Sequence, residues 1–139
     1  MASSTKSAFT DNYDTIPGLY TTTDLSAAQF KVVMLNITTP GQIKLAGTSV
    51  IARSAFVLMS DPKGTSTAPV NAEVAYKGIV KVIAGTSVIK CGDKLGVNTT
   101  SQVVNTSSAN RFIIGVALSN SAAIGDVISA ALIEGGSLY

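Results

Sequence analysis

Hydrophobic residues in this chain are grouped in short runs of strand length, and few stretches have the spacing of an amphipathic helix. Residues 30–37 (FKVVMLNI), 55–59 (AFVLM), 112–118 (FIIGVAL) and 127–133 form such runs. An apolar run of this length is typical of a strand, and the third run, which is apolar on both faces, is predicted to be a central strand. Gly115, inside the third run, predicts a β-bulge or a close backbone approach. These four segments are therefore predicted strands.

Residues 74–83 alternate instead. Val74, Tyr76, Gly78, Val80 and Val82 fall on one face of the extended chain, and Lys77, Ile79 and Lys81 fall on the other. Because successive side chains of a strand point to opposite faces, this segment is predicted to be a strand with one buried face.

Turn residues separate the predicted strands. The connectors are Thr39-Pro40-Gly41, Asp61-Pro62-Lys63-Gly64, Cys91-Gly92-Asp93, Asn98-Thr99-Thr100 and Gly125-Asp126, and these residue types favour turns. The best helical candidate is a single turn over Asp24–Gln29, with Asp24 as its cap. The pattern as a whole predicts an all-β domain.

The sequence AGTSVI occurs twice, at residues 46–51 and 84–89. In each copy, Ala-Gly predicts a turn and Thr-Ser-Val-Ile predicts the start of another β segment. Two copies are too few for a stable solenoid. The repeat is interpreted either as one favourable hairpin sequence that occurs twice or as the remnant of a duplication. Neither interpretation indicates where a binding site lies.

The two ends of the chain differ from the domain at residues 24–134. Residues 1–23 are rich in Ser, Thr and Asp and are interpreted either as a disordered start or as an extended arm that orders on a partner. The candidate anchors of that arm are Phe9, Tyr13, Leu19 and Tyr20. The tail at residues 135–139 is either a frayed end or a hinge that docks Leu138 and Tyr139 on a neighbour.

The composition favours a binding or structural role. Charged residues make up only 13% of the 139 residues, hydrophobic residues make up 46%, and the net charge is +2. This charge gives no electrostatic footprint for nucleic acid, and it leaves much neutral surface for contact with another protein. The length fits one domain with an arm and a tail.

The side chains that most enzymes use are scarce. The chain has no His, which excludes Ser-His-Asp and Cys-His arrangements and most transition-metal sites. Cys91 stands alone, the eight acids are scattered, and no glycine-rich phosphate loop is present. We expect no enzyme activity, metal or cofactor. Without a signal segment or a membrane-length apolar run, we expect a soluble protein made in a reducing cytoplasm.

Residues 24–134 resemble the capsid cement (head decoration) proteins of tailed phages. The match is carried by the order of DLSAAQFKVV at 24–33, GIVKVIAGTSVIKCGDKLGV at 78–97, IIGVAL at 113–118 and GDVISAAL at 125–132. The family often has a glycine near position 101, where this chain has Ser101. The first 23 residues lie outside the resemblance.

The resemblance implies a compact β-barrel or β-tulip-like domain with an extended N-terminal arm. It also implies a virion protein on the outer surface of the expanded head, which stabilises the lattice of the major capsid protein. Such proteins commonly form homotrimers at three-fold and quasi-three-fold junctions. On this view the arm, through Phe9, Tyr13, Leu19 and Tyr20, pairs with the capsid protein, and neither nucleic acid nor membrane is a partner.

Two rival functions remain open. The first is a carbohydrate- or host-binding module on a virion or cell surface, with Tyr13, Tyr20 and Tyr139 as its platform. The second is a nucleotide-dependent strand-exchange enzyme, against which the missing phosphate loop and the missing His both argue.

Overall fold

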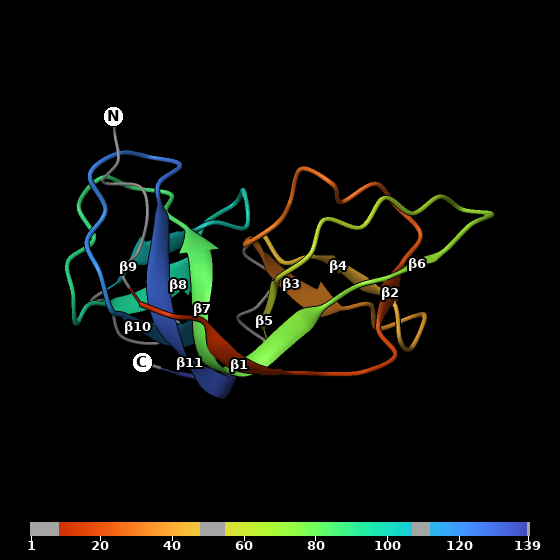
Figure 1. The fold of residues 1–139 in the computed structure, drawn as a ribbon, viewed down its shortest axis with the longest axis horizontal. Coiled ribbons are helices and arrows are strands. Elements are labelled where there is room, and N and C mark those ends of the chain that lie inside the picture. Colours follow the sequence, from red (N-terminus) through yellow and green to blue (C-terminus); the bar gives the residue numbers. More distant parts are fainter. Residues whose placement is uncertain (1–8, 48–54, 107–111, 139) are drawn as a thin grey trace.

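The computed structural model of the chain describes residues 9–47, 55–106 and 112–138. Within these residues the chain forms eleven β-strands and no helix (Figure 1). The strands are β1 (Asn12–Thr15), β2 (Tyr20–Thr21), β3 (Val32–Leu35), β4 (Ile43–Leu45), β5 (Phe56–Leu58), β6 (Val70–Asn71), β7 (Val74–Ile83), β8 (Lys94–Val97), β9 (Val103–Asn105), β10 (Phe112–Ala117) and β11 (Val127–Leu138). The all-β prediction is confirmed.

Nine of these strands form one curled antiparallel sheet. Its order is β4-β3-β5-β7-β11-β10-β8-β9, with β1 added on β7, while β2 and β6 pair separately. The sheet curls until β9 returns to the end of β7, where the Gly85 N–H donates to the Val103 carbonyl oxygen at 2.7 Å. The result is the compact, barrel-like domain that was predicted (Figure 1).

The long strand β7 is shared between the two halves of the sheet. Its first two residues pair with β5, its later residues pair with β11, and β1 runs along its other edge. The register of β1 jumps from Lys77 to Ala75, so Tyr76 is the extra residue of a bulge. At Gly78, φ is +108°, and a Cβ there would collide with the backbone of β1. A side chain at this position is therefore incompatible with the crossing of the two strands.

The bulge divides the strand that the sequence predicted to have a single buried face. Val80 and Val82 lie in the main core inside the curled sheet, together with Ala75. Val74 lies in a second core on the other side, with Tyr76 packed against it. The expectation that Val74, Val80 and Val82 share one face is wrong, because one extra residue reverses the alternation.

The two cores explain the continuous apolar runs. Alternate residues of β3 and β5 enter different cores: Val32, Met34 and Val57 lie in the main core, with Met59 just after β5, and Val33, Phe56 and Leu58 lie in the second core. The second core is closed by the segment before β3, through Leu19, Leu25 and Ala28. Leu19, from the predicted arm, and Leu25 and Ala28, from the start of the predicted domain, thus cover the outer face of β3 and β5.

Two local predictions fail where the backbone turns sharply. The strand predicted from residue 30 begins at Val32, because Phe30 has φ +69° and lies in a turn. The segment Asp24–Gln29 forms turns and no helix; Asp24 accepts a hydrogen bond from the Ser26 N–H at 3.0 Å, so it caps a turn. By contrast, the irregularity predicted at Gly115 is present as a shift in the pairing of β10 with β11.

The second AGTSVI copy is described in full, and it is a loop after its first residue. Ala84 forms an isolated β-bridge with Val103. Ile89 is buried in the main core, but no strand begins between the end of β7 at Ile83 and the start of β8 at Lys94. The predicted β segment at Thr86–Ile89 is therefore wrong. Residues 48–51 of the first copy lie outside the described residues.

Ser101 joins the two ends of the curled sheet. It is buried and has φ +64°, the left-handed conformation that glycine adopts most easily. Its carbonyl oxygen accepts from the Val32 N–H at 2.8 Å, and its Oγ accepts from the Gly47 N–H at 2.9 Å. The serine thus occupies a backbone conformation that suits glycine, and its side chain adds a hydrogen bond that glycine cannot make.

Leu19→Ala tests whether the N-terminal segment is part of the folded domain. Leu19 is only 7% exposed, so its truncation should lower the free energy of unfolding by about 2–5 kcal/mol. Urea unfolding measures this, with Ile124→Ala as the control, because Ile124 is 70% exposed and should change stability by less than about 0.5 kcal/mol. Equal unfolding midpoints for the two variants would contradict the second core.

Substitutions at Ser101 separate its backbone conformation from its side-chain bond. Ser101→Ala loses the hydrogen bond to Gly47 and keeps the positive φ, whereas Ser101→Gly loses the same bond and relieves the backbone. We expect Gly to be more stable than Ala by about 1 kcal/mol, and wild type to be at least as stable as Gly. Thermal unfolding of the three proteins measures the order, and an Ala variant as stable as the Gly variant would refute it.

Candidate interaction surfaces

The four predicted anchors of the N-terminal arm lie in different environments. Phe9 is 45% exposed just before β1, whereas Leu19 is buried in the second core. Tyr13, in β1, is half-buried against the main core. Tyr20, in β2, is half-buried beside Gly41, where a Cβ would lie 3.1 Å from its ring. Three of the four side chains therefore contribute to intramolecular packing, and their role toward a capsid stays a prediction.

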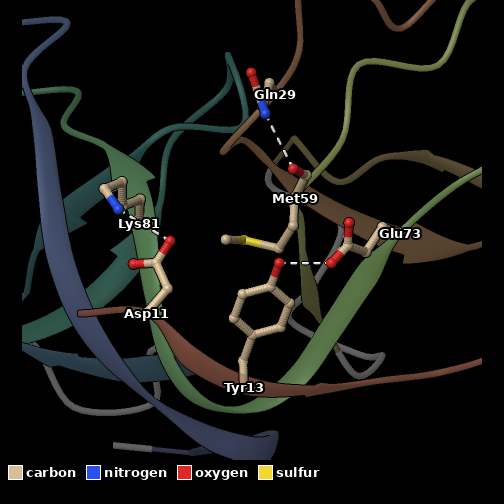
Figure 2. A network of polar contacts seen from close by, with 6 residues as sticks. All are labelled: Asp11, Tyr13, Gln29, Met59, Glu73 and Lys81. Atoms are coloured by element: carbon tan, nitrogen blue, oxygen red, sulfur yellow. Dashed lines mark hydrogen bonds and ion pairs between the residues drawn. The ribbon is translucent and has the colours of Figure 1, made fainter.

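Tyr13 fastens β1 to the loop before β7. Its hydroxyl donates a 2.6 Å hydrogen bond to Oε2 of Glu73, and both side chains converge in Figure 2. Burial of the ring, the bond to Glu73, and the negative charges of Glu73 and Asp11 raise the pKa of Tyr13 from 10.0 to about 12. The neutral phenol is therefore the form that the folded state favours.

Ion pairs accompany β1 along β7. Lys81 lies 3.0 Å from Asp11, as Figure 2 shows, and Lys77 lies 3.5 Å from Asp14 and 4.0 Å from Glu134. Partly exposed pairs of this kind contribute about 0–1 kcal/mol each. The backbone pairing of β1 with β7 and the packing of Tyr13 therefore do more to hold this segment than its charges.

The predicted tail contact is partly described. Leu138 is the last residue of β11, where its backbone pairs with Phe112. Tyr139 lies outside the described residues. The tail thus continues a strand through residue 138, and docking on a neighbour stays a prediction.

Two exposed apolar side chains at one end of the domain were not predicted. Val88 is 55% exposed and Ile124 is 70% exposed, in the loops after β7 and after β10. Ser121 joins these loops, since its Oγ accepts from the Ile89 N–H at 3.0 Å and donates to the Thr86 carbonyl oxygen at 2.8 Å. We call this pair of loops, residues 84–93 and 118–126, the loop platform.

Asp126 shapes the other half of the loop platform. One of its carboxylate oxygens accepts from the N–H groups of Ala122 and Ala123, at 2.7 and 2.9 Å. The turn that carries Ile124 is therefore held by hydrogen bonds to the buried side chain of Asp126. Its sequence signal was a single apolar residue among small turn residues, which periodicity does not detect.

A second exposed apolar group lies at the end of the sheet formed by β3 and β4. Leu35, Ile37 and Leu45 are exposed there, and Leu35 and Leu45 lie diagonally on one face, given the pairing of Leu35 with Ile43. The apolar run at residues 30–37 does not show which of its side chains are exposed. Leu35 and Ile37 are exposed because β3 has only the short edge strand β4 beyond it.

The described residues include few groups that could react or bind a metal ion. Cys91 is a free, exposed thiol, and no group of three or more His, Cys, Asp or Glu side chains is placed to hold a metal ion within this part of the chain. No helix among the described residues is long and apolar enough to cross a membrane.

The fold is shared with a phage head protein. The crystal structure of the head fiber gp8.5 N base in bacteriophage phi29 superposes with a TM-score of 0.64 at 16% sequence identity, over 87% of this chain and 94% of that chain. No family model matches the sequence, and no curated protein matches it. At this identity the likeness shows that the two chains share a fold.

Tyr13 predicts a pH dependence of stability. Its pKa is raised to about 12 from 10.0, so its contribution is fully present below about pH 10 and is lost as the pH rises toward about 12. Wild type should lose more stability than Tyr13→Phe between about pH 9 and pH 11.5 in urea titrations. A phenolate absorbance step near pH 12 should also disappear in that variant, and identical pH profiles would contradict the assignment.

Proposed function

We propose that this protein is a structural component of a phage head that binds the outer surface of the expanded capsid and stabilises the major capsid protein lattice. In this proposal it acts by binding and not by catalysis. The observation that carries it is the fold shared with the phi29 head fiber N base over 87% of the chain. A fold can host unrelated functions, so the sequence and the surface must support the same role.

The sequence supports this role independently of the fold. The order of the sequence segments over residues 24–134 resembles that of phage cement proteins. Charged residues are scarce, at 13%, as in the core of a protein interface. The exposed apolar tips Val88 and Ile124 lie on hydrogen-bonded loops, and such preorganised contacts lose little entropy on binding.

Stabilisation of the lattice follows from linkage. A protein that binds the mature lattice and not a loosened one stabilises it by about 2.7 kcal/mol per site when its free concentration is a hundred times Kd. A homotrimer that bridges three capsid subunits gains about 10²–10⁴ in avidity without strong individual contacts. We propose the trimer at three-fold and quasi-three-fold junctions on this basis.

The N-terminal anchors enter the proposal in a modified form. Phe9 is exposed and lies before β1, so its ring is accessible to a capsid in the folded domain. Use of Leu19 by a partner would instead open the second core. No observation favours the carbohydrate alternative, because the Tyr13 hydroxyl is bonded to Glu73 and the Tyr20 ring lies against Gly41.

Native mass spectrometry and co-sedimentation test the proposal together. The purified protein should give a trimer of three 14.2 kDa chains, and it should sediment with expanded phage heads that lack a decoration protein. Unexpanded proheads serve as the control and should bind less. A protein that remains in the supernatant with expanded heads would overturn the proposed function, whatever its oligomeric state.

A further inference from the structure

The curled sheet leaves a seam between its first strand and the turn that leads to its last strand. Ser101 bridges the seam at one point, through its bonds to Val32 and Gly47. Beside this bridge lies an open groove of about 460 Å³. It is lined by Lys31, Leu45, Ala46, Gly47, Thr99, Thr100 and Ser101. We call it the seam groove.

One wall of the seam groove is an exposed strand edge. The Asn36 N–H donates to the Gln42 carbonyl oxygen, and the Ala46 N–H donates to the Val32 carbonyl oxygen. Hydrogen-bonded and non-hydrogen-bonded residues alternate along an antiparallel pair, so the N–H and C=O of Leu45 point away from β3. Tyr20 bridges the start of this edge at Gln42, but no described strand lies beside Leu45. Edge groups of this kind are templates for an added extended segment.

The residues that line the seam groove indicate which side chains an added segment would carry. Lys31 is the single charged residue among those that line the groove, and it is half-buried. None of the ion pairs among the described residues involves it. The sequence has no Asp or Glu from residue 25 to residue 60, where it has Lys31, Lys44 and Arg53. Leu45, which is 39% exposed, adds an apolar contact beside this cation.

We propose that the seam groove binds an extended segment of a partner protein, paired with the backbone at Leu45 and carrying a carboxylate that meets Lys31. A second copy of this chain is disfavoured as the occupant, because it would bring two cationic edges together without an acid. A charge-assisted bond from Lys31 would fix the register of the added segment. Ser101 has a strained backbone at the adjoining bridge, and such strain is concentrated at functional sites.

The proposal rests on the proposed function, in which the partner is the capsid protein, and the test separates the two. Wild type, Lys31→Met and Lys63→Met are titrated onto expanded heads, after urea unfolding confirms that each is folded. Lys63 is an exposed lysine outside both the seam groove and the loop platform, so it controls for loss of net charge. We expect Lys31→Met to weaken binding about tenfold or more, with little change for Lys63→Met, and we expect Lys31→Arg to restore binding in part.

Hydrogen exchange on bound wild-type protein gives a second readout. The amide of Leu45 should exchange more slowly on the heads than in free protein, since an added strand would accept its hydrogen bond. Wild type that binds heads with unchanged exchange at Leu45, or Lys31→Met that binds like Lys63→Met, would overturn the seam groove and leave the proposed function standing.

Wild-type protein that does not bind expanded heads would overturn the proposed function. The seam groove is then tested separately with a peptide. The probe is acetyl-Thr-Val-Glu-Val-Thr-amide at millimolar concentration, with its Gln analogue as control. Amide shifts at Leu45 and Gly47 with the Glu peptide, much smaller with the Gln peptide or in Lys31→Met, would support the groove. Equal shifts with both peptides, or none with either, would overturn it.

Discussion

The arrangement of the domain depends on how β7 is crossed and bent. This strand pairs with β5, with β11 and, on its other edge, with β1. The extra residue Tyr76 and the glycine at position 78 let one strand serve both halves of the sheet. The main core and the second core lie on opposite sides because the alternation of side chains reverses there. Without that reversal, the apolar residues at the two ends of β7 would require burial on the same side.

Burial on both faces of β3 and β5 determines the role of the N-terminal segment. A sheet that is apolar on both faces needs a second cover, and Leu19, Leu25 and Ala28 provide it. The segment is therefore fixed by the fold in the absence of a partner, which differs from an arm that becomes ordered only on binding. The loss of chain entropy on ordering this segment is offset within the domain.

The sequence was sufficient for the fold class and for most of the strands. Apolar runs and the alternation over residues 74–83 located β3, β5, β7, β10 and β11 because each buries a regular face. The failures share a cause, which is that tertiary contacts decide them. Phe30 and Ser101 adopt positive φ under the constraint of hydrogen bonds to distant strands. The exposure of Leu35 and Leu45 follows from the position of β4 at the end of the sheet, and strand order is not encoded in local periodicity.

The distribution of charge gives the two candidate surfaces different capacities. From Leu95 to Gly125 the sequence has one charged residue, Arg111, and the exposed Ile124 of the loop platform lies within this neutral region. A symmetric contact brings identical side chains of several copies close together, and a neutral apolar surface avoids the like-charge repulsion that this causes. The seam groove has Lys31 without an acid in an ion pair, so a different chain with a carboxylate complements it better than a copy does. In the proposed function, contact between copies and contact with a capsid protein thus make opposite electrostatic demands, and the neutral segment around Ile124 and the seam groove each suit one of them.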